Sequence, residues 1–475
     1  MIWDMNTSSA VSENGERGGH SSSRAWRSLG LGVCLYGLAL ALMYLSIPSG
    51  VTRETVTITG PDGKPCVGTV WKPALSKAVM LIGHGVTSNQ GVMATVAKAF
   101  AENGYTAVTL DFWGHGRSQE RFDWSTNAAQ LKAWIAWAHT LGKVPVGYLG
   151  HSMGGMAGAV ALAAPDTGVG AFVSLGMLPR QFSSCKMLVA AGRFEELFNG
   201  AQARAESAGK ADVIISPFSD HMLEPVDPVL LTRIIAWTNT ALGFSGPVHF
   251  PWGRWACAML GALLGCAAAF SLAGFVAGLV PRRELAAPIP SATRSWSVNP
   301  YRVAGRMLGR RGVGGAPRSG SFIVALAKGI VFGAVFVLLL SWVLDVHIFT
   351  CGLAHPGRFA TWFIFTPFLM PLFLAGAWAL ERVQLDTVGV RFFVSAFTRC
   401  APLLLLSAAL FAAMPSLAFG CMILCIWAFI MAMLSGVHAV ATLRTADYRA
   451  GAVASAITLA WTLAFWLPLS WPWIR

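Results

Sequence analysis

The sequence predicts two kinds of structure in one chain: an α/β domain with a mainly parallel sheet flanked by helices, and an all-α transmembrane region. Two features of the 475 residues indicate this division. Only 12% of the residues are charged, against about 25% in a typical soluble chain. The charges also gather in the middle, because residues 48–254 hold 16 of the 35 Lys and Arg residues and 14 of the 22 Asp and Glu residues. This composition excludes one large soluble enzyme and an intrinsically disordered chain.

Long runs with almost no charge flank the middle of the chain. A helix that spans a membrane needs about 20 apolar residues. The runs cover residues 29–47, 255–281, 321–344, 359–380, 400–443 and 450–474. The run over 400–443 would be about 66 Å long as one helix, so we split it at Pro415 into two passes. We therefore expect one N-terminal span and about six C-terminal spans.

These runs divide the chain into six parts. We expect a disordered cytoplasmic tail over residues 1–27, a transmembrane signal anchor over 28–48, an extracytoplasmic α/β domain over 49–250, a transmembrane span over 251–281, a basic cytoplasmic loop over 282–320 and a five-span membrane domain over 321–475. A cleaved signal peptide is the alternative for the first apolar run. Its length, and the weak match to a small-x-small cleavage site, favour an uncleaved anchor.

The arginines predict the orientation. With the N-terminus in the cytoplasm, 16 arginines fall in segments on the cytoplasmic side, and two, Arg358 and Arg475, fall in short outer segments. The α/β domain then lies outside the cytoplasm, in the periplasm if the source is Gram-negative. We therefore expect a multi-pass protein of the plasma (inner) membrane. The lipid bilayer is its expected partner, the basic loop contacts anionic lipid, and no nucleic-acid partner is expected.

The middle of the chain alternates between strand and helix patterns. Residues 51–59 alternate polar and apolar as a half-buried strand does, a turn follows at 60–63, and residues 66–71 return as a second strand. Six short apolar runs come next, over residues 78–82, 107–110, 144–149, 171–175, 187–190 and 213–215. Helix-like stretches over 91–103, 127–141 and 194–208 lie between them. Strands that are buried on both faces and separated by helices predict a mainly parallel sheet.

The most informative motif is Gly-x-Ser-x-Gly at residues 150–154, directly after the run over 144–149. In a strand–turn–helix context the serine sits on a tight, strained turn that projects its Oγ from the edge of the sheet. Side chains at Gly150 and Gly154 would clash with the neighbouring backbone. The helix that follows directs its N–H groups and the positive end of its dipole at a developing oxyanion. Ser152 is therefore the candidate nucleophile.

With this motif, residues 51–243 resemble an α/β-hydrolase domain, over about 40% of the chain. Residues 81–86 (LIGHGV) resemble the family's His-Gly oxyanion loop, and residues 111–118 (DFWGHGRS) resemble a turn found in its esterases, lipases and peptidases. Members of the family commonly insert a cap domain after the strand that follows the nucleophile helix. Here residues 176–186 form a short connection, so we expect no sizeable cap. The spans, or the outer surface of the membrane, would then supply the missing wall of the active site.

The resemblance implies the remaining site residues. His221 follows the last strand run, where the family places its catalytic histidine. Glu195 fills the position of the acid after the run over 187–190, and Glu196 stays open as the alternative. The backbone N–H groups of Met153 and Val86 would form the oxyanion hole. The resemblance implies no metal and no cofactor.

The predicted function is a membrane-anchored serine hydrolase, carboxylesterase-like or lipase-like, that cleaves a small-molecule or lipid-like ester through an acyl-enzyme. Three other activities of the same fold stay open: serine peptidase, thioesterase and acyltransferase. A further alternative is a non-catalytic binding module on a membrane transport or signalling protein. The sequence leaves the oligomeric state open.

Overall fold

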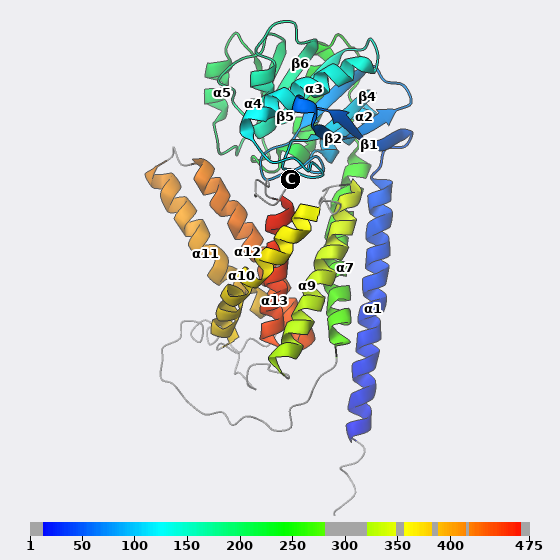
Figure 1. Cartoon of the computed structure of the whole chain (residues 1–475), viewed down its shortest axis with the longest axis vertical. Coiled ribbons are helices and arrows are strands. Elements are labelled where there is room, and N and C mark those ends of the chain that lie inside the picture. Colours follow the sequence, from blue (N-terminus) through cyan, green and yellow to red (C-terminus); the bar gives the residue numbers. More distant parts are fainter. Residues whose placement is uncertain (1–12, 281–320, 348–355, 382–387, 415–417, 467–475) are drawn as a thin grey trace, which may run out of the picture.

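A sheet-containing domain lies on one end of a layer of long helices (Figure 1). The computed structural model describes residues 13–280, 321–347, 356–381, 388–414 and 418–466. Helix α1 (Glu13–Leu45) runs alongside α7 (Trp252–Gly278), and the sheet domain lies between them in the chain. The chain therefore enters the sheet domain from one long helix and leaves it by another.

Eight strands form one sheet in the order β1-β2-β4-β3-β5-β6-β7-β8. The strands are β1 (Val51–Thr59), β2 (Pro65–Pro73), β3 (Ala78–Gly83), β4 (Tyr105–Asp111), β5 (Val146–His151), β6 (Val169–Leu175), β7 (Lys186–Gly192) and β8 (Asp212–Ser216). β2 pairs antiparallel with β1 and with β4, and the pairs from β4 to β8 are parallel. This order places β5, which carries the Gly-x-Ser-x-Gly motif, near the centre of the sheet.

Helices cover both faces of this sheet. The helices are α2 (Ala94–Glu102), α3 (Asn127–Thr140), α4 (Met153–Ala161), α5 (Gly200–Ser207) and α6 (Pro228–Ala241), with single 3₁₀ turns η1 (Pro61–Gly63), η2 (Trp124–Thr126) and η3 (Glu224–Val226). Successive strand residues face opposite sides, so Val79 and Leu81 of β3 pack with α3, α4 and α5, whereas Met80 and Ile82 pack with α2 and α6. The mainly parallel sheet flanked by helices is confirmed.

The loops at the carboxyl ends of the strands are short. The β6–β7 connection, residues 176–185, contains neither helix nor strand, which confirms that the domain has no sizeable cap. The helix predicted over 194–208 begins only at Gly200, because the Asn199 side chain caps it by accepting a hydrogen bond from the Gln202 N–H at 2.8 Å. Residues 193–199 therefore form a loop, and this loop carries the candidate acid Glu195.

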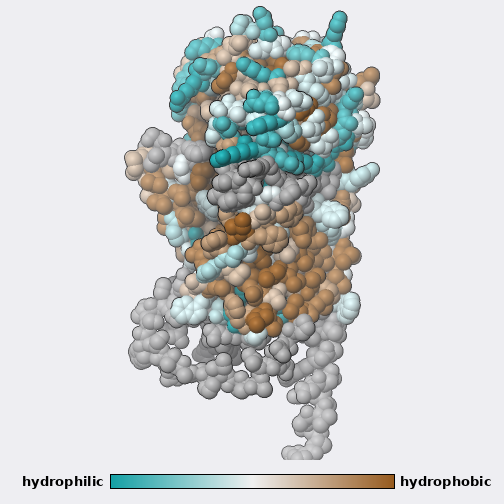
Figure 2. All heavy atoms as spheres, viewed as in Figure 1, coloured by the Kyte–Doolittle hydropathy of each residue, from teal (hydrophilic) through white to brown (hydrophobic). Residues whose placement is uncertain are grey.

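The C-terminal part consists of long apolar helices, which indicate a membrane protein. They are α9 (Phe322–His347), α10 (Pro356–Glu381), α11 (Val388–Ala413), α12 (Ala418–Thr445) and α13 (Tyr448–Trp466). Within the described ranges, α7, α9, α10, α11 and α12 are long and apolar enough to cross a membrane, and residues 29–45 of α1 form a shorter apolar helix. The surface over this helix layer is hydrophobic, in contrast to the polar surface of the sheet domain (Figure 2).

Two predictions about these helices can be compared with the structure, and their outcomes differ. The long run over 400–443 is divided near Pro415, with α11 ending at Ala413 and α12 beginning at Ala418. The predicted disordered tail over 1–27 is wrong for residues 13–27, because α1 already begins at Glu13. A formed apolar helix needs no new nucleus to extend by further turns. Residues 1–12 and the basic loop over 281–320 lie outside the described residues.

Small residues allow close packing in the helix layer. Gly329 and Gly333 of α9 face α13, and a Cβ at Gly329 would lie 2.6 Å from the Val453 Cβ. Spacing of small residues by four is a common way for helices to approach each other in membranes. The buried core of this layer joins α7, α9, α10, α12 and α13 into one unit.

Candidate active site

Ser152 sits on a sharp turn between β5 and α4. Its backbone has φ 51° and ψ −111°, a left-handed conformation that is strained for a residue with a side chain. A Cβ on Gly150 would lie 2.3 Å from the Gly154 carbonyl carbon, and a Cβ on Gly154 would lie 2.8 Å from the Gly83 backbone. Both glycines are therefore required by the close backbone approach, as the motif predicts. The turn leaves Ser152 partly exposed at the carboxyl end of the sheet.

The two backbone N–H groups proposed as oxyanion donors lie on neighbouring segments. Val86 packs against a small apolar cluster that contains Met153, Phe112 and Ala157. Within the described part of the chain, neither the Val86 N–H nor the Met153 N–H donates a hydrogen bond. Thr87, which follows Val86, has φ 60°, so this loop is also held in a left-handed conformation. Two unused donors beside the nucleophile are what an oxyanion site needs.

A buried polar network fixes the oxyanion loop to the turn over 111–118. The His84 ring contacts the Gly85 carbonyl through Nδ1 at 2.7 Å, and its Nε2 accepts a hydrogen bond from the Phe112 N–H at 3.2 Å. Burial lowers the pKa of His84 to about 4, so the ring is neutral at pH 7. Asp111 accepts hydrogen bonds from the backbone N–H groups of Gln90 and Arg117 at 2.9 and 2.8 Å. These two side chains are buried and hold the two loops together.

His221 and Glu195 are in direct contact. The His221 Nδ1–H donates to Glu195 Oε2 at 2.8 Å, and both side chains are at least nine-tenths buried. Because Nδ1 carries the proton, Nε2 is the nitrogen that can accept a proton from a nucleophile. The other carboxylate oxygen of Glu195 accepts the Leu197 N–H at 2.9 Å, which holds the acid in its loop. The pair has the geometry of a base with its orienting acid.

Glu196, the alternative acid, contacts a different part of His221. Its Oε2 accepts a hydrogen bond from the His221 backbone N–H at 3.2 Å, so it fixes the loop and not the ring. Asp220, next to the histidine, accepts the backbone N–H groups of Met222 and Leu223 and acts as a local cap. Of the two candidate acids, Glu195 is therefore the one that contacts the His221 ring.

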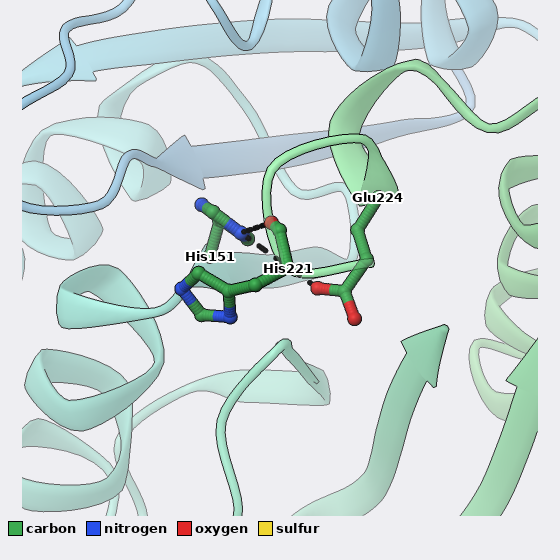
Figure 3. Close-up of side chains that lie close together, drawn as sticks. All are labelled: His151, His221 and Glu224. Carbon is green, nitrogen blue, oxygen red and sulfur yellow. Dashed lines mark hydrogen bonds and ion pairs between the residues drawn. The ribbon is translucent and has the colours of Figure 1, made fainter. Parts of the chain in front are cut away.

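Two buried side chains behind the His221 loop were not anticipated from the sequence. The His151 Nε2–H donates to the His221 carbonyl at 2.9 Å (Figure 3). Glu224 Oε1 accepts the Gly192 N–H at 2.7 Å, and its Oε2 lies 3.7 Å from His151 Nε2. A Cβ on Gly176 would lie 2.2 Å from Glu224 Oε2, so the glycine leaves the space that this carboxyl occupies. Together these contacts pack the His221 loop against β5 and β7.

Burial favours the neutral form of both of these side chains. Burial, and secondarily the neighbouring His221, lowers the pKa of His151 to about 3. Burial and the nearby Glu195 carboxylate raise the pKa of Glu224 well above its usual range. The only sequence signal for Glu224 was its place in the loop after β8, three residues beyond His221. That position alone gives no reason to expect burial.

His151, His221 and Glu224 also form a group that could hold a metal ion, since one ligand atom from each lies within 4.8 Å of the others. In the described structure His151 Nε2 and His221 Nδ1 make the hydrogen bonds given above, whereas His151 Nδ1 and Glu224 Oε2 make none. A metal bound through His151 Nε2 or His221 Nδ1 would replace one of those two contacts. The residues fit a hydrogen-bonded support for the His221 loop, because Nε2 of His151 and Nδ1 of His221 already have hydrogen-bond partners in the described structure.

The candidate nucleophile and base lie on adjacent segments, because the ring of His151, the residue before Ser152, lies 4.8 Å from the His221 ring. Within the described residues, the Ser152 hydroxyl makes no hydrogen bond with His221. Hydrogen bonds between catalytic groups are often long without substrate and tighten in the complex. The structure thus brings all five predicted site residues, Ser152, His221, Glu195, Met153 and Val86, to loops at one edge of the sheet.

Comparison with known proteins agrees with this fold. Residues 74–205 match the family described as serine aminopeptidase, S33. Among curated proteins, a "Putative phosphoribosyl transferase" of Mycobacterium tuberculosis is 26% identical over 188 residues, which is 36% of this chain. The chain spans 42% of the length of that relative.

Among solved structures, a cold-adapted esterase from an Arctic intertidal metagenomic library is 21% identical and covers 41% of this chain and 96% of its own, with a TM-score of 0.34. An α/β serine hydrolase without lid from Xanthomonas campestris is 19% identical and covers 42% of this chain and 95% of its own, with a TM-score of 0.33. Residues 74–205 are therefore similar to this hydrolase family, and the sheet domain has the mainly parallel architecture of an α/β-hydrolase fold.

Proposed function

We propose that the protein is a membrane-anchored serine hydrolase that cleaves esters with a Ser152–His221–Glu195 triad. The observation that carries the proposal is the contact of His221 Nδ1 with Glu195 Oε2 at 2.8 Å, on the same sheet edge as a serine with a left-handed backbone. This contact fixes the tautomer that leaves Nε2 free to accept a proton.

Acylation follows from these positions. His221 Nε2 takes the proton of the Ser152 hydroxyl while Oγ forms a bond with the ester carbonyl carbon. The carbonyl oxygen becomes an oxyanion, which accepts hydrogen bonds from the N–H groups of Met153 and Val86. The tetrahedral intermediate collapses, the ester C–O bond breaks, and His221 gives its proton to the leaving alkoxide.

Deacylation repeats the same steps with water. His221 takes a proton from a water molecule, and the oxygen of that water attacks the acyl-enzyme carbonyl. The bond between Ser152 Oγ and the acyl carbon breaks, the serine regains its proton from His221, and the carboxylic acid leaves. Glu195 stays ionised throughout and stabilises the imidazolium that forms in both halves.

The proposed location follows from the arginine distribution. Sixteen arginines fall in segments on the side of the N-terminus, and two, Arg358 and Arg475, fall in the short segments on the opposite side. We propose that the N-terminus is cytoplasmic and that the hydrolase domain lies outside the cytoplasm, on a plasma membrane. An amide substrate is the second candidate, because the matching family is described as serine aminopeptidases.

The test uses the full chain, purified in detergent, with 4-methylumbelliferyl butyrate and with the amide alanine 7-amido-4-methylcoumarin. We expect ester hydrolysis that falls at least 1,000-fold in Ser152→Ala and in His221→Ala, on the order of the losses known for triads. His249→Ala is the matched control, since the hydrogen bonds that His249 makes within the described residues use its backbone. Ester hydrolysis that survives in Ser152→Ala would contradict the proposal, and faster turnover of the amide would favour the peptidase.

A further inference from the structure

The catalytic edge of the sheet faces the helix layer (Figure 1). Val92, in the loop after β3, packs against the buried core of that layer. The Arg358 guanidinium, at the start of α10, donates to the carbonyls of Gly114 and Gly116 at 2.9 and 3.2 Å, in the turn after β4. All of these loops follow the carboxyl ends of parallel strands, the edge at which Ser152 projects.

The loop that carries the catalytic histidine is also tied to the helices. The Trp255 indole N–H, near the start of α7, donates to the Val226 carbonyl at 3.0 Å. Val226 belongs to η3, which follows His221 directly in the same connection. Contacts at the loops after β3, β4 and β8 therefore hold the hydrolase domain with its active-site edge toward the apolar helices, not toward bulk water.

A group of exposed apolar side chains borders the triad on this edge. We call Phe194, Phe218, Met222 and Leu223 the apolar rim. Their exposed fractions are 60, 69, 47 and 52%. Phe194 directly precedes Glu195, and the other three lie within three residues of His221. Side chains of this size are exposed together mainly where they meet an apolar partner.

We infer that the hydrolase draws its substrate from the bilayer, as an amphipathic ester whose acyl chain passes over the apolar rim to Ser152. The inference rests on the proposed function and adds the substrate class. Two independent features carry it: the active-site edge is fixed against helices that are long enough to span a membrane, and the rim is apolar where the triad opens. The short connection over 176–185 provides no cap of the protein's own.

The membrane then does what a cap does in other enzymes: it covers the mouth and excludes water. A water-soluble ester with a short acyl group gains little from the rim, because it has little apolar surface to bury. A long acyl chain already lies in the bilayer, and the rim offers it apolar side chains beside the loops that carry Glu195 and His221. The rim is therefore expected to discriminate by acyl length and not by leaving group.

The experiment compares two esters that share a leaving group. Full-length protein is reconstituted in phosphatidylcholine vesicles, with 4-methylumbelliferyl oleate in the same bilayer or 4-methylumbelliferyl acetate in solution. The readout is the ratio of kcat/KM for the oleate to kcat/KM for the acetate. We expect the ratio to fall at least 10-fold in the double variant Phe194→Ser/Phe218→Ser and to recover in Phe194→Leu/Phe218→Leu.

The matched control is Leu75→Ser/Leu141→Ser. Both leucines are exposed, at 88 and 46%, and both precede strands of the sheet, so they lie at its opposite edge. The ratio should stay within twofold of wild type in this variant. Diluting the oleate in the bilayer at constant bulk concentration should also slow its turnover.

Four results would decide against the inference. An unchanged ratio in the serine rim variant would exclude a role of the rim, and oleate turnover that ignores dilution in the bilayer would exclude delivery from the membrane. If wild type hydrolyses neither ester and Ser152 is not labelled by a fluorophosphonate, the proposed function itself fails and the inference fails with it. Acetate turnover without oleate turnover would keep the function and overturn the substrate class alone.

Discussion

Replacing Arg358 with alanine tests how the helix layer supports the active site. The guanidinium is 1% exposed and donates to three carbonyls: those of Gly114 and Gly116 in the hydrolase domain, and that of Ala464 in α13 at 2.9 Å. A hydrogen bond from a charged donor contributes about 1.5–3 kcal/mol. Two such bonds hold the turn over 111–118. We take about 1.5 kcal/mol for each bond, the lower end of this range, because water can reach the carbonyls once the side chain is gone.

Loss of both bonds then costs roughly 3 kcal/mol, which makes opening of the turn about 100-fold more frequent. The assay is hydrogen exchange with mass spectrometry of the full chain in detergent. The amides of His115, Arg117 and Ser118 donate hydrogen bonds within this turn, so they report its opening. We expect their exchange to accelerate about 100-fold in Arg358→Ala, while β6 stays unchanged.

Arg180→Ala is the control, because Arg180 is exposed in the β6–β7 connection. It should leave the exchange of the turn within twofold of wild type. Arg358→Lys should give an intermediate rate, since an ammonium keeps the charge but lacks the planar fork. Exchange in Arg358→Ala within threefold of wild type would refute the reasoning, because the arginine would then not hold the turn.

Three further predictions concern the site itself. Glu195→Gln should lower kcat for 4-methylumbelliferyl butyrate by about 100- to 10,000-fold, while Glu196→Gln should lower kcat less than about 10-fold. The reverse order would show that Glu196, and not Glu195, orients the histidine. Gly150→Ala should lower Tm by more than about 5 °C, because the added methyl group would lie 2.3 Å from backbone atoms. In the control Gly253→Ala the methyl group meets nothing within 4 Å, so Tm should stay unchanged. Equal shifts in the two variants would contradict the tight turn at Ser152. His84 has a pKa of about 4 in the folded chain and 6.5 in the unfolded chain, so it binds a proton more readily when the chain is unfolded. The free energy of unfolding should therefore fall by about 3 kcal/mol as pH falls from 6.5 to 4. A denaturation series in which the free energy of unfolding of His84→Asn falls as steeply with pH as that of wild type would contradict this.

The fold could be predicted from the sequence because its signals are local. Each buried strand is a short apolar run, and the glycines around Ser152 are required by backbone contacts within the motif or with the adjacent strand. The break at Pro415 follows from helix length alone. The boundary of α5 was missed because the cap at Asn199 competes with an otherwise helical pattern.

The parts of the site that escaped prediction depend on contacts between distant residues. Glu195 and Glu196 are neighbours of equal chemistry, and only the fold brings the first to the His221 ring and the second to its backbone. Arg358 was visible in the sequence only as an arginine in a short outer segment. Its partner Gly114 lies 244 residues away, so no local pattern could join them.

The most direct test of the central claim is the site of covalent labelling by a fluorophosphonate. Detergent-purified protein is labelled, digested and analysed by mass spectrometry, with Ser152→Ala and His221→Ala beside wild type. A nucleophile activated by its own base reacts with this probe, whereas an ordinary serine does not. The account predicts one modified peptide, carrying the adduct on Ser152, and no labelling in either variant. Folded wild-type protein that stays unlabelled, or labelling that persists in His221→Ala, would contradict it.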